Sequence, residues 1–164
     1  MPKRAGWFAL AAGVVLVDQL VKWVMLARFA PGEAREVLPF FNLVLVFNKG
    51  AAFSFLAREA GWQTPLLIGF SLAASVVVSV LIVRNADKRL LCSALTLILG
   101  GALGNVIDRL RFGYVVDFFD FHALGWHFAA FNVADSAITI GAALLILDGL
   151  LRSEARLPKD ARMP

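Results

Sequence analysis

The sequence predicts a small all-α membrane protein with four transmembrane helices and a small β-sheet at the outer membrane surface. Of its 164 residues, 60% are apolar and 17% are charged, and the mean hydropathy is +0.76. Soluble domains are about 45–50% apolar and about 25% charged. The composition therefore argues against a soluble domain. It also excludes a disordered chain, a collagen and a disulfide scaffold, because the chain is apolar, lacks a glycine period and has one cysteine.

The four helices are expected near residues 6–27, 64–83, 90–110 and 132–151. The middle two are the clearest, since 24 uncharged residues follow Glu59 and 18 follow Arg89. At 1.5 Å per residue these runs extend about 36 Å and about 27 Å, which suits a hydrocarbon core about 30 Å thick.

The first span can also be interpreted as a cleavable signal peptide. Lys3 and Arg4 resemble its basic region, and the uncharged stretch 5–17 resembles its apolar core. No small-x-small cleavage site follows, and Asp18 and Lys22 come next instead. We therefore expect an uncleaved helix.

Basic residues predict the orientation. Nine of the 16 fall in segments that four helices place on one side, and the short loop 84–89 alone holds three. Because Lys and Arg collect on the cytoplasmic side, both termini and the basic tail 153–164 are expected there. This distribution explains the net charge of +4 without a nucleic-acid partner.

The two outer segments are unusually apolar. β-Branched and aromatic residues in 40–47 favour a strand, 48–50 is a turn signal, and 51–56 is expected to return as a second strand. The sheet over 37–56 and the aromatic outer loop 111–131 should both rest at the membrane interface. Without repeats or linkers, residues 1–164 are expected to form one domain.

Most polar residues of the spans are predicted to lie at one depth, just inside the outer leaflet. Such residues in a membrane mark a functional site by default, and this arrangement predicts a site open sideways to lipid. They are Asp18 and Lys22 in the first helix, Asn105, Asp108 and Arg109 in the third, Asn132, Asp135 and Thr139 in the fourth, and Asn48 and Asp117 in the outer segments.

Two of these carboxylates, Asp117 and Asp135, have no cationic neighbour in the sequence. Two carboxylates brought close together share a proton and can act as base and acid on a peptide bond. Asp18 has Lys22 four residues on, and Arg109 is the candidate partner of Asp108. We expect a structural role for Asp18 and Asp108, whereas spacing alone leaves catalytic and structural roles open for the other pair.

Other chemistries stay open at this point. A metal site could use Asp117, Asp120, His122 and His127, although no His-Glu-x-x-His helix is present. Histidines beside aromatic residues are more often interfacial, so a metalloprotease is disfavoured.

A Ser–Lys hydrolase could use Ser54 with Lys22 or Lys49, but neither spacing is diagnostic. A small transporter or proton-relay subunit would also use intramembrane Asp and Lys. It should, however, have polar residues at several depths, and the inner halves of these helices are nearly bare.

Four sequence blocks resemble the lipoprotein signal peptidase (signal peptidase II) family. They are DQLVK at 18–22, NKGAAFS at 48–54, GGALGNVIDR at 100–109 with GYVVDF at 113–118, and FNVADSAITIG at 131–141. The resemblance implies a catalytic pair at Asp117 and Asp135, with no metal or organic cofactor. It implies supporting roles for Asp18, Lys22, Asn48, Asn105, Asp108, Arg109 and Asn132.

The resemblance further implies an aspartic endopeptidase of the bacterial plasma (inner) membrane. Such enzymes cut prolipoproteins just before a diacylglyceryl-modified cysteine. Lipid-modified prolipoproteins and membrane lipids are the expected partners, the chain is expected to act as a monomer, and the active site is expected on the extracytoplasmic side. The family fold adds a sheet cradle and an outer helical or loop lid, for which 114–131 is the candidate; His122, Trp126 and His127 match no motif.

Overall fold

The computed structural model describes residues 2–50 and 62–156. Its helices are α1 (Pro2–Arg28), α2 (Gln63–Arg84), α3 (Arg89–Phe112) and α4 (Val133–Arg156). Each of these four is long and apolar enough to cross a membrane. The predicted fold class is confirmed. The spans expected near 6–27, 64–83 and 90–110 lie inside the first three helices, and 132–151 begins one residue before α4 and ends before it does.

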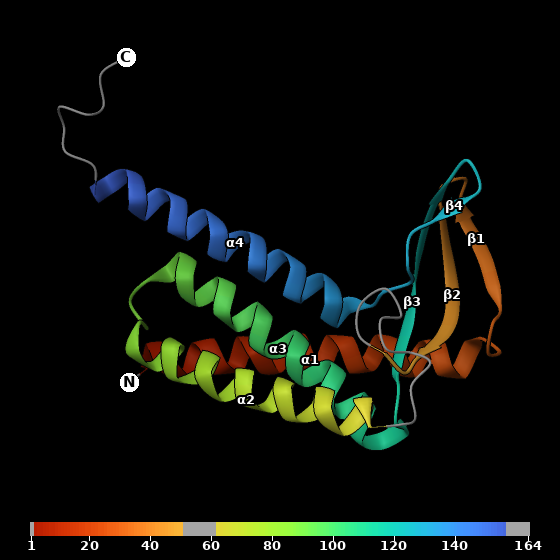
Figure 1. Ribbon diagram of the computed structural model, residues 1–164, viewed down its shortest axis with the longest axis horizontal. Coiled ribbons are helices and arrows are strands. Elements are labelled where there is room, and N and C mark those ends of the chain that lie inside the picture. The colour runs from red at the N-terminus through yellow and green to blue at the C-terminus, as the bar shows by residue number, and fades with distance from the viewer. Residues whose placement is uncertain (1, 51–61, 157–164) are drawn as a thin grey trace, which may run out of the picture.

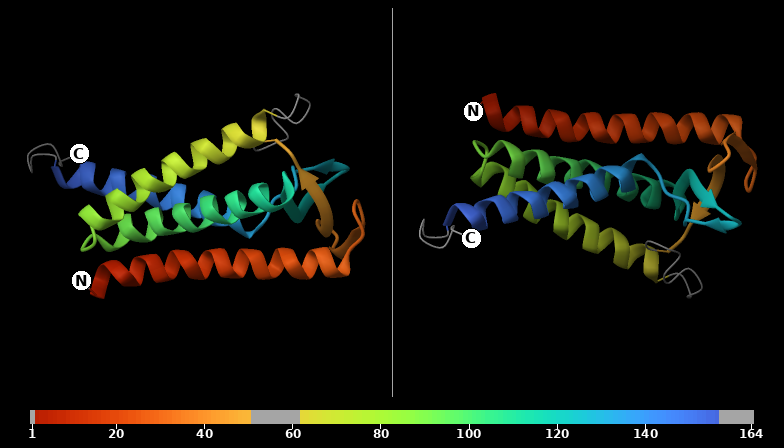
Figure 2. Two further views of the ribbon diagram at one scale, coloured as in Figure 1. Left: turned by 90° about the horizontal axis from the view of Figure 1, so that it is seen from below. Right: turned by 90° about the horizontal axis from the view of Figure 1, so that it is seen from above.

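The helices run lengthwise beside one another, with the sheet at one end and the start of α1 and the end of α4 at the other (Figures 1 and 2). α3 is central and contacts all three other helices. Small residues allow α3 to pack closely against its neighbours. At Gly101, for example, an added Cβ would meet the carbonyl oxygen of Ala134 on α4. α2 instead exposes large apolar side chains such as Phe70 and Val76, as expected of a helix facing lipid.

The antiparallel sheet has the strand order β1-β2-β3-β4. Its strands are β1 (Ala34–Leu38), β2 (Phe41–Asn48), β3 (Val115–Ala123) and β4 (Trp126–His127). The strand expected over 40–47 is β2, the turn at 48–50 forms with the Gly50 N–H donating to Asn48 Oδ1, and the return strand expected at 51–56 lies outside the described residues.

The outer loop expected over 111–131, with 114–131 as the candidate lid, differs from that expectation. Its middle forms β3 and β4 of the same sheet, with Asp117 opposite Val46 in the register. The physical reason is local: its β-branched and aromatic residues suit a pleated surface, and β2 offers an edge with which to pair.

An apolar cluster joins the sheet to the end of α1. Met25, Leu45, Val116 and Phe118 are buried together there. Because successive strand side chains point to opposite faces, Asp117 between the last two is directed away from this cluster, toward α3 and α4. The packing of β3 therefore fixes the direction of one predicted catalytic carboxylate.

Candidate active site

Lys22 is the centre of a buried ion-pair cluster. Its Nζ lies 2.8 Å from Asp18 Oδ2 and 2.8 Å from Asp108 Oδ2, and it donates to Asn105 Oδ1 at 3.1 Å. The expected pairing of Lys22 with Asp18 is present. The expected partner of Asp108 was wrong: it is Lys22 on α1 rather than Arg109, since adjacent residues of a helix point in different directions.

Two carboxylate oxygens of this cluster also accept hydrogen bonds from backbone N–H groups. Asp18 Oδ1 accepts from the Ala134 N–H at 2.9 Å, and Asp108 Oδ2 accepts from the Val116 N–H at 3.1 Å. The two carboxylates thus tie α1 to the start of α4 and α3 to β3, which agrees with a structural role.

Gln19 also belongs to this cluster, and sequence reasoning missed it. Its Nε2 lies 2.8 Å from Asp108 Oδ1, 3.2 Å from the Gly104 carbonyl and 3.3 Å from Asp18 Oδ2. The available signal was an uncharged amide inside an apolar span, where polar groups are costly.

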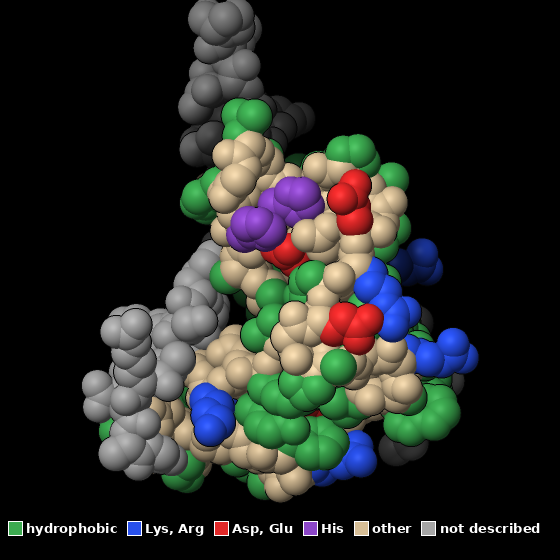
Figure 3. Space-filling view, turned by 90° about the vertical axis from the view of Figure 1, so that its right-hand side faces the viewer, with side chains coloured by type: hydrophobic (Ala, Val, Ile, Leu, Met, Phe, Trp, Pro, Cys, Tyr) green, Lys and Arg blue, Asp and Glu red, His purple; other side chains and the backbone are tan. Residues whose placement is uncertain are grey.

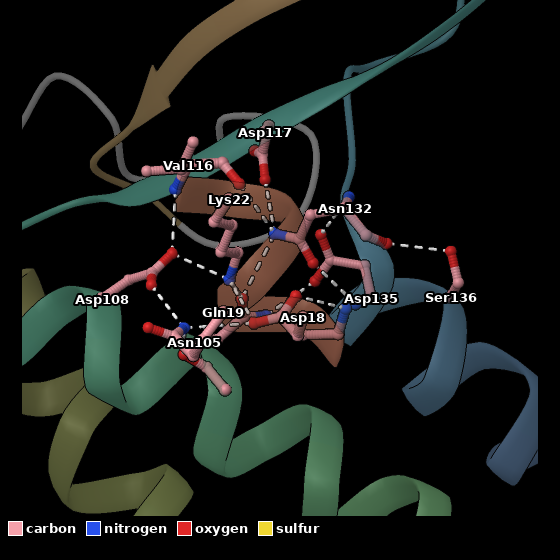
Figure 4. A network of polar contacts seen from close by, with 12 residues as sticks. Asp18, Gln19, Lys22, Asn105, Asp108, Val116, Asp117, Asn132, Asp135 and Ser136 are labelled. Atoms are coloured by element: carbon pink, nitrogen blue, oxygen red, sulfur yellow. Dashed lines mark hydrogen bonds and ion pairs between the residues drawn. The ribbon is translucent and has the colours of Figure 1, made fainter. Parts of the chain in front are cut away.

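Asn132 joins the two predicted catalytic carboxylates. Its Nδ2 donates to Asp117 Oδ1 at 2.7 Å. It also caps α4, because Asn132 Oδ1 accepts from the Asp135 N–H at 2.9 Å while the Asn132 N–H lies 3.3 Å from Asp135 Oδ2. This reciprocal pairing is a capping box. Figure 4 shows both carboxylates beside Asn132, one from β3 and one from the first turn of α4.

Two further amides complete this arrangement. Asn48 Nδ2 donates to Asp117 Oδ2 at 3.0 Å, and Asn105 Nδ2 donates to Asp135 Oδ1 at 2.8 Å. Since Asn105 Oδ1 accepts from Lys22, the ammonium sets the orientation of this amide and hence its donation to Asp135.

Burial raises the pKa of Asp117, which is 2% exposed, and the negative charge of Asp135 raises it further, to about 7. Hydrogen bonds from Asn48 and Asn132 act in the opposite direction. A carboxyl group with a pKa near neutrality can both hold and release a proton at physiological pH, which acid–base catalysis requires.

A cavity of about 580 Å³ lies beside the pair. Its polar wall carries Asp135, Asn48, Asn105 and Arg109, whose Nη2 donates to the Gly50 carbonyl at 3.2 Å. The rest of its lining is mostly apolar: Val115, Phe128, Ala129, Ala130, Phe131, Ser136, Ile138, Thr139 and Ile140. The volume falls within the range of about 300–1,000 Å³ typical of ligand pockets.

The residues of the alternative metal site, which lie on β3 and β4, are divided between the two faces of the sheet. His127 Nδ1 lies 3.0 Å from Asp120 Oδ2, and the rings of His122 and His127 stack with centroids 4.9 Å apart (Figure 3). Alternation along the strand directs Asp117 to the other face. Asp120 is buried in β3.

The Ser–Lys alternative has no support in the described residues. Ser54 lies outside them, Lys49 is exposed, and the Lys22 ammonium is held by three acceptors. The Lys22 ammonium is thus held inside the ion-pair cluster by Asp18, Asp108 and Asn105.

Comparison with known proteins gives consistent matches over most of the chain. The family model for signal peptidase (SPase) II matches residues 10–151. A lipoprotein signal peptidase of Paraburkholderia phymatum is 53% identical over 148 residues, covering 90% of this chain and 89% of that protein. One of Ralstonia nicotianae is 55% identical over 146 residues, covering 89% of this chain and 84% of that protein.

The fold has a solved counterpart as well. A bacterial membrane enzyme determined by the in meso method at 2.3 Å resolution superposes with a TM-score of 0.84 at 31% identity, covering 94% of this chain and 93% of that chain.

Proposed function

Because the chain belongs to the signal peptidase II family, we propose that it is an aspartic endopeptidase that removes signal peptides from lipid-modified prolipoproteins. The observation that carries the catalytic assignment is the joining of Asp117 and Asp135 through Asn132 beside a cavity. The comparisons favour a peptidase over the transporter alternative.

In the proposed reaction a water lies between the two carboxyl groups. Asp135, in the first turn of α4 where the helix dipole favours negative charge, is the base. Asp117, with its pKa near 7, holds the shared proton. Asp135 takes a proton from the water as the hydroxide attacks the scissile carbonyl carbon, and Asp117 donates its proton to the developing oxyanion.

Collapse of the tetrahedral intermediate reverses these roles. The protonated Asp135 donates to the leaving amine as the carbon–nitrogen bond breaks, and Asp117 recovers its proton as the new carboxyl group forms. Both side chains then return to their starting protonation states, so the cycle needs no cofactor.

The supporting residues have different proposed roles. Asn48 and Arg109 line the cavity and are proposed to hold the substrate main chain. Asn132, Asn105 and Asn48 donate directly to the carboxylates and orient them. The cluster of Asp18, Lys22, Asp108 and Gln19 fixes the helices on which the site is built.

The proposed location is the bacterial plasma (inner) membrane, with the chain acting as a monomer. The basic loop 84–89, the start of α1 and the end of α4 lie at the end of the helices away from the sheet (Figure 1). The positive-inside rule assigns that end to the cytoplasm and the site to the extracytoplasmic side, where a lipidated precursor presents its scissile bond.

The test is cleavage of a lipidated precursor by purified variants. Asp117→Asn and Asp135→Asn should each abolish cleavage while the protein stays folded, since each removes one proton-transfer group. Asp120→Asn changes a carboxylate on the other face of the same strand and should leave cleavage intact. A fully active variant of either dyad residue refutes the mechanism.

Two further arms test substrate and cofactor. An unlipidated version of the precursor should be cut poorly, and equal turnover of both would count against a site at the lipid boundary. A chelator should leave the rate unchanged, and a loss that zinc restores would revive the metal alternative.

A further inference from the structure

A second cavity lies at the opposite end of the helices from the active site. It has a volume of about 470 Å³ and is lined by Gly6, Trp7, Leu10, Ala86, Asp87 and Arg89. Figure 2 shows the start of α1 beside the turn between α2 and α3 at this end. The Trp7 indole Nε1 donates to the Ala86 carbonyl at 3.0 Å, so this wall is fixed across the two segments.

The charge around this cavity is predominantly positive. Arg84, Lys88 and Arg89 are exposed in and beside the turn, and Arg4 is exposed one turn before the tryptophan. Among the described residues, the three arginines have no hydrogen-bond or ion-pair partner for their side chains. Asp87, which also lines the cavity, brings one negative charge to this mostly basic surrounding.

From this combination we infer that the cavity binds the headgroup of an anionic phospholipid. Arg89 would face the phosphate, while Trp7 and Leu10 would contact the first part of the acyl chains. Indoles prefer the headgroup depth of a membrane, and basic pockets between transmembrane helices on the cytoplasmic side bind anionic headgroups. The volume is within the range of about 300–1,000 Å³ for ligand sites.

This site is separate from the peptidase reaction. Arg89 begins α3 and Arg109 lies near its end, which places them about 30 Å apart at 1.5 Å per residue. Loss of lipid binding and loss of cleavage are therefore independent results.

The experiment measures lipid retained by the full-length protein. The protein is prepared in detergent micelles that contain equal amounts of phosphatidylglycerol and phosphatidylcholine. Native mass spectrometry then removes the micelle and measures which lipid molecules stay bound to the protein. Arg89→Gln should lower phosphatidylglycerol occupancy by about fivefold, the effect of one basic residue near an anionic surface. Arg111→Gln removes the same charge from the other end of α3 and should leave occupancy unchanged. Because Arg89 is exposed, its variant should keep the unfolding temperature of the wild type.

Three results would overturn the inference. Equal retention of the two lipids would show that the headgroup charge is not recognised. An equal loss in the Arg89 and Arg111 variants would show general attraction rather than a site. Full displacement of phosphatidylglycerol by inorganic phosphate would show that the cavity recognises a free anion and not a lipid.

Discussion

Asp117→Asn should reduce the dependence of stability on pH. The folded-state pKa of Asp117 is about 7 against an ordinary value of 3.8, because burial and the charge of Asp135 oppose ionisation. Between these values the folded protein binds more protons than the unfolded chain, so the free energy of unfolding falls as the pH rises. The difference of about 3 pKa units corresponds to a fall of at most about 4 kcal/mol.

The stabilising contribution of this group is thus present below its unfolded pKa and is lost as the pH rises through the folded value. Asparagine does not titrate, so the variant should lack this part of the fall. It should also lose about 1–3 kcal/mol at every pH, because its amide would place a donor against Asn48 or Asn132.

The assay is urea unfolding of purified protein in micelles between about pH 4 and about pH 8, followed by tryptophan fluorescence. Glu36→Gln is the control, since Glu36 is exposed on β1 and its replacement should leave the wild-type pH dependence. If Asp117→Asn kept the full wild-type fall, the assignment of the shared proton to Asp117 would be wrong.

Two further substitutions test the packing beneath the site. Lys22→Met should lower the free energy of unfolding by about 3–5 kcal/mol, because it leaves two buried carboxylates without their cation. Lys88→Met, at an exposed position, is the control. If Lys22→Met destabilised the protein no more than this control does, the stabilising role of Lys22 would be contradicted. Gly101→Ala should lower the free energy of unfolding by about 1–3 kcal/mol and lower kcat, because its Cβ would meet Ala134, the residue before Asp135 in the first turn of α4. Gly69→Ala, on open space in α2, should not destabilise, and equal stability of the two alanine variants would exclude the close contact.

The helices could be predicted from the sequence because lipid imposes a simple requirement on them. A span needs an uninterrupted apolar length, and the charge-free runs before Arg84 and Asp108 supply it. The sheet was harder to predict, since β3 becomes a strand only by pairing with β2, which lies about 70 residues earlier in the chain. Aromatic content alone could not distinguish an interfacial loop from a half-buried strand.

Contacts across helices were the least predictable part of the site. The sequence shows that Lys22 is four residues from Asp18, but not that α3 presents Asp108 to the same ammonium. Arg109 is adjacent to Asp108 in the sequence and was therefore its expected partner. Sequence distance, however, does not show which side chains the packing of two helices brings together. Gln19 was missed for the same reason, since its three contacts depend on how α1 meets α3.

Asn132 shows where the two kinds of information meet. The spacing Asn132-x-x-Asp135 is a helix-start signal, and the structure contains the capping pair that it implies. The same asparagine also donates to Asp117, a contact that exists only because the pairing of β2 with β3 brings that carboxylate to the start of α4. The Asn132 side chain therefore caps the first turn of α4 and also positions Asp117 relative to Asp135. The placement of the proposed dyad is thus coupled to the fold itself, and a change that shifts either β3 or α4 must disturb both carboxylates together.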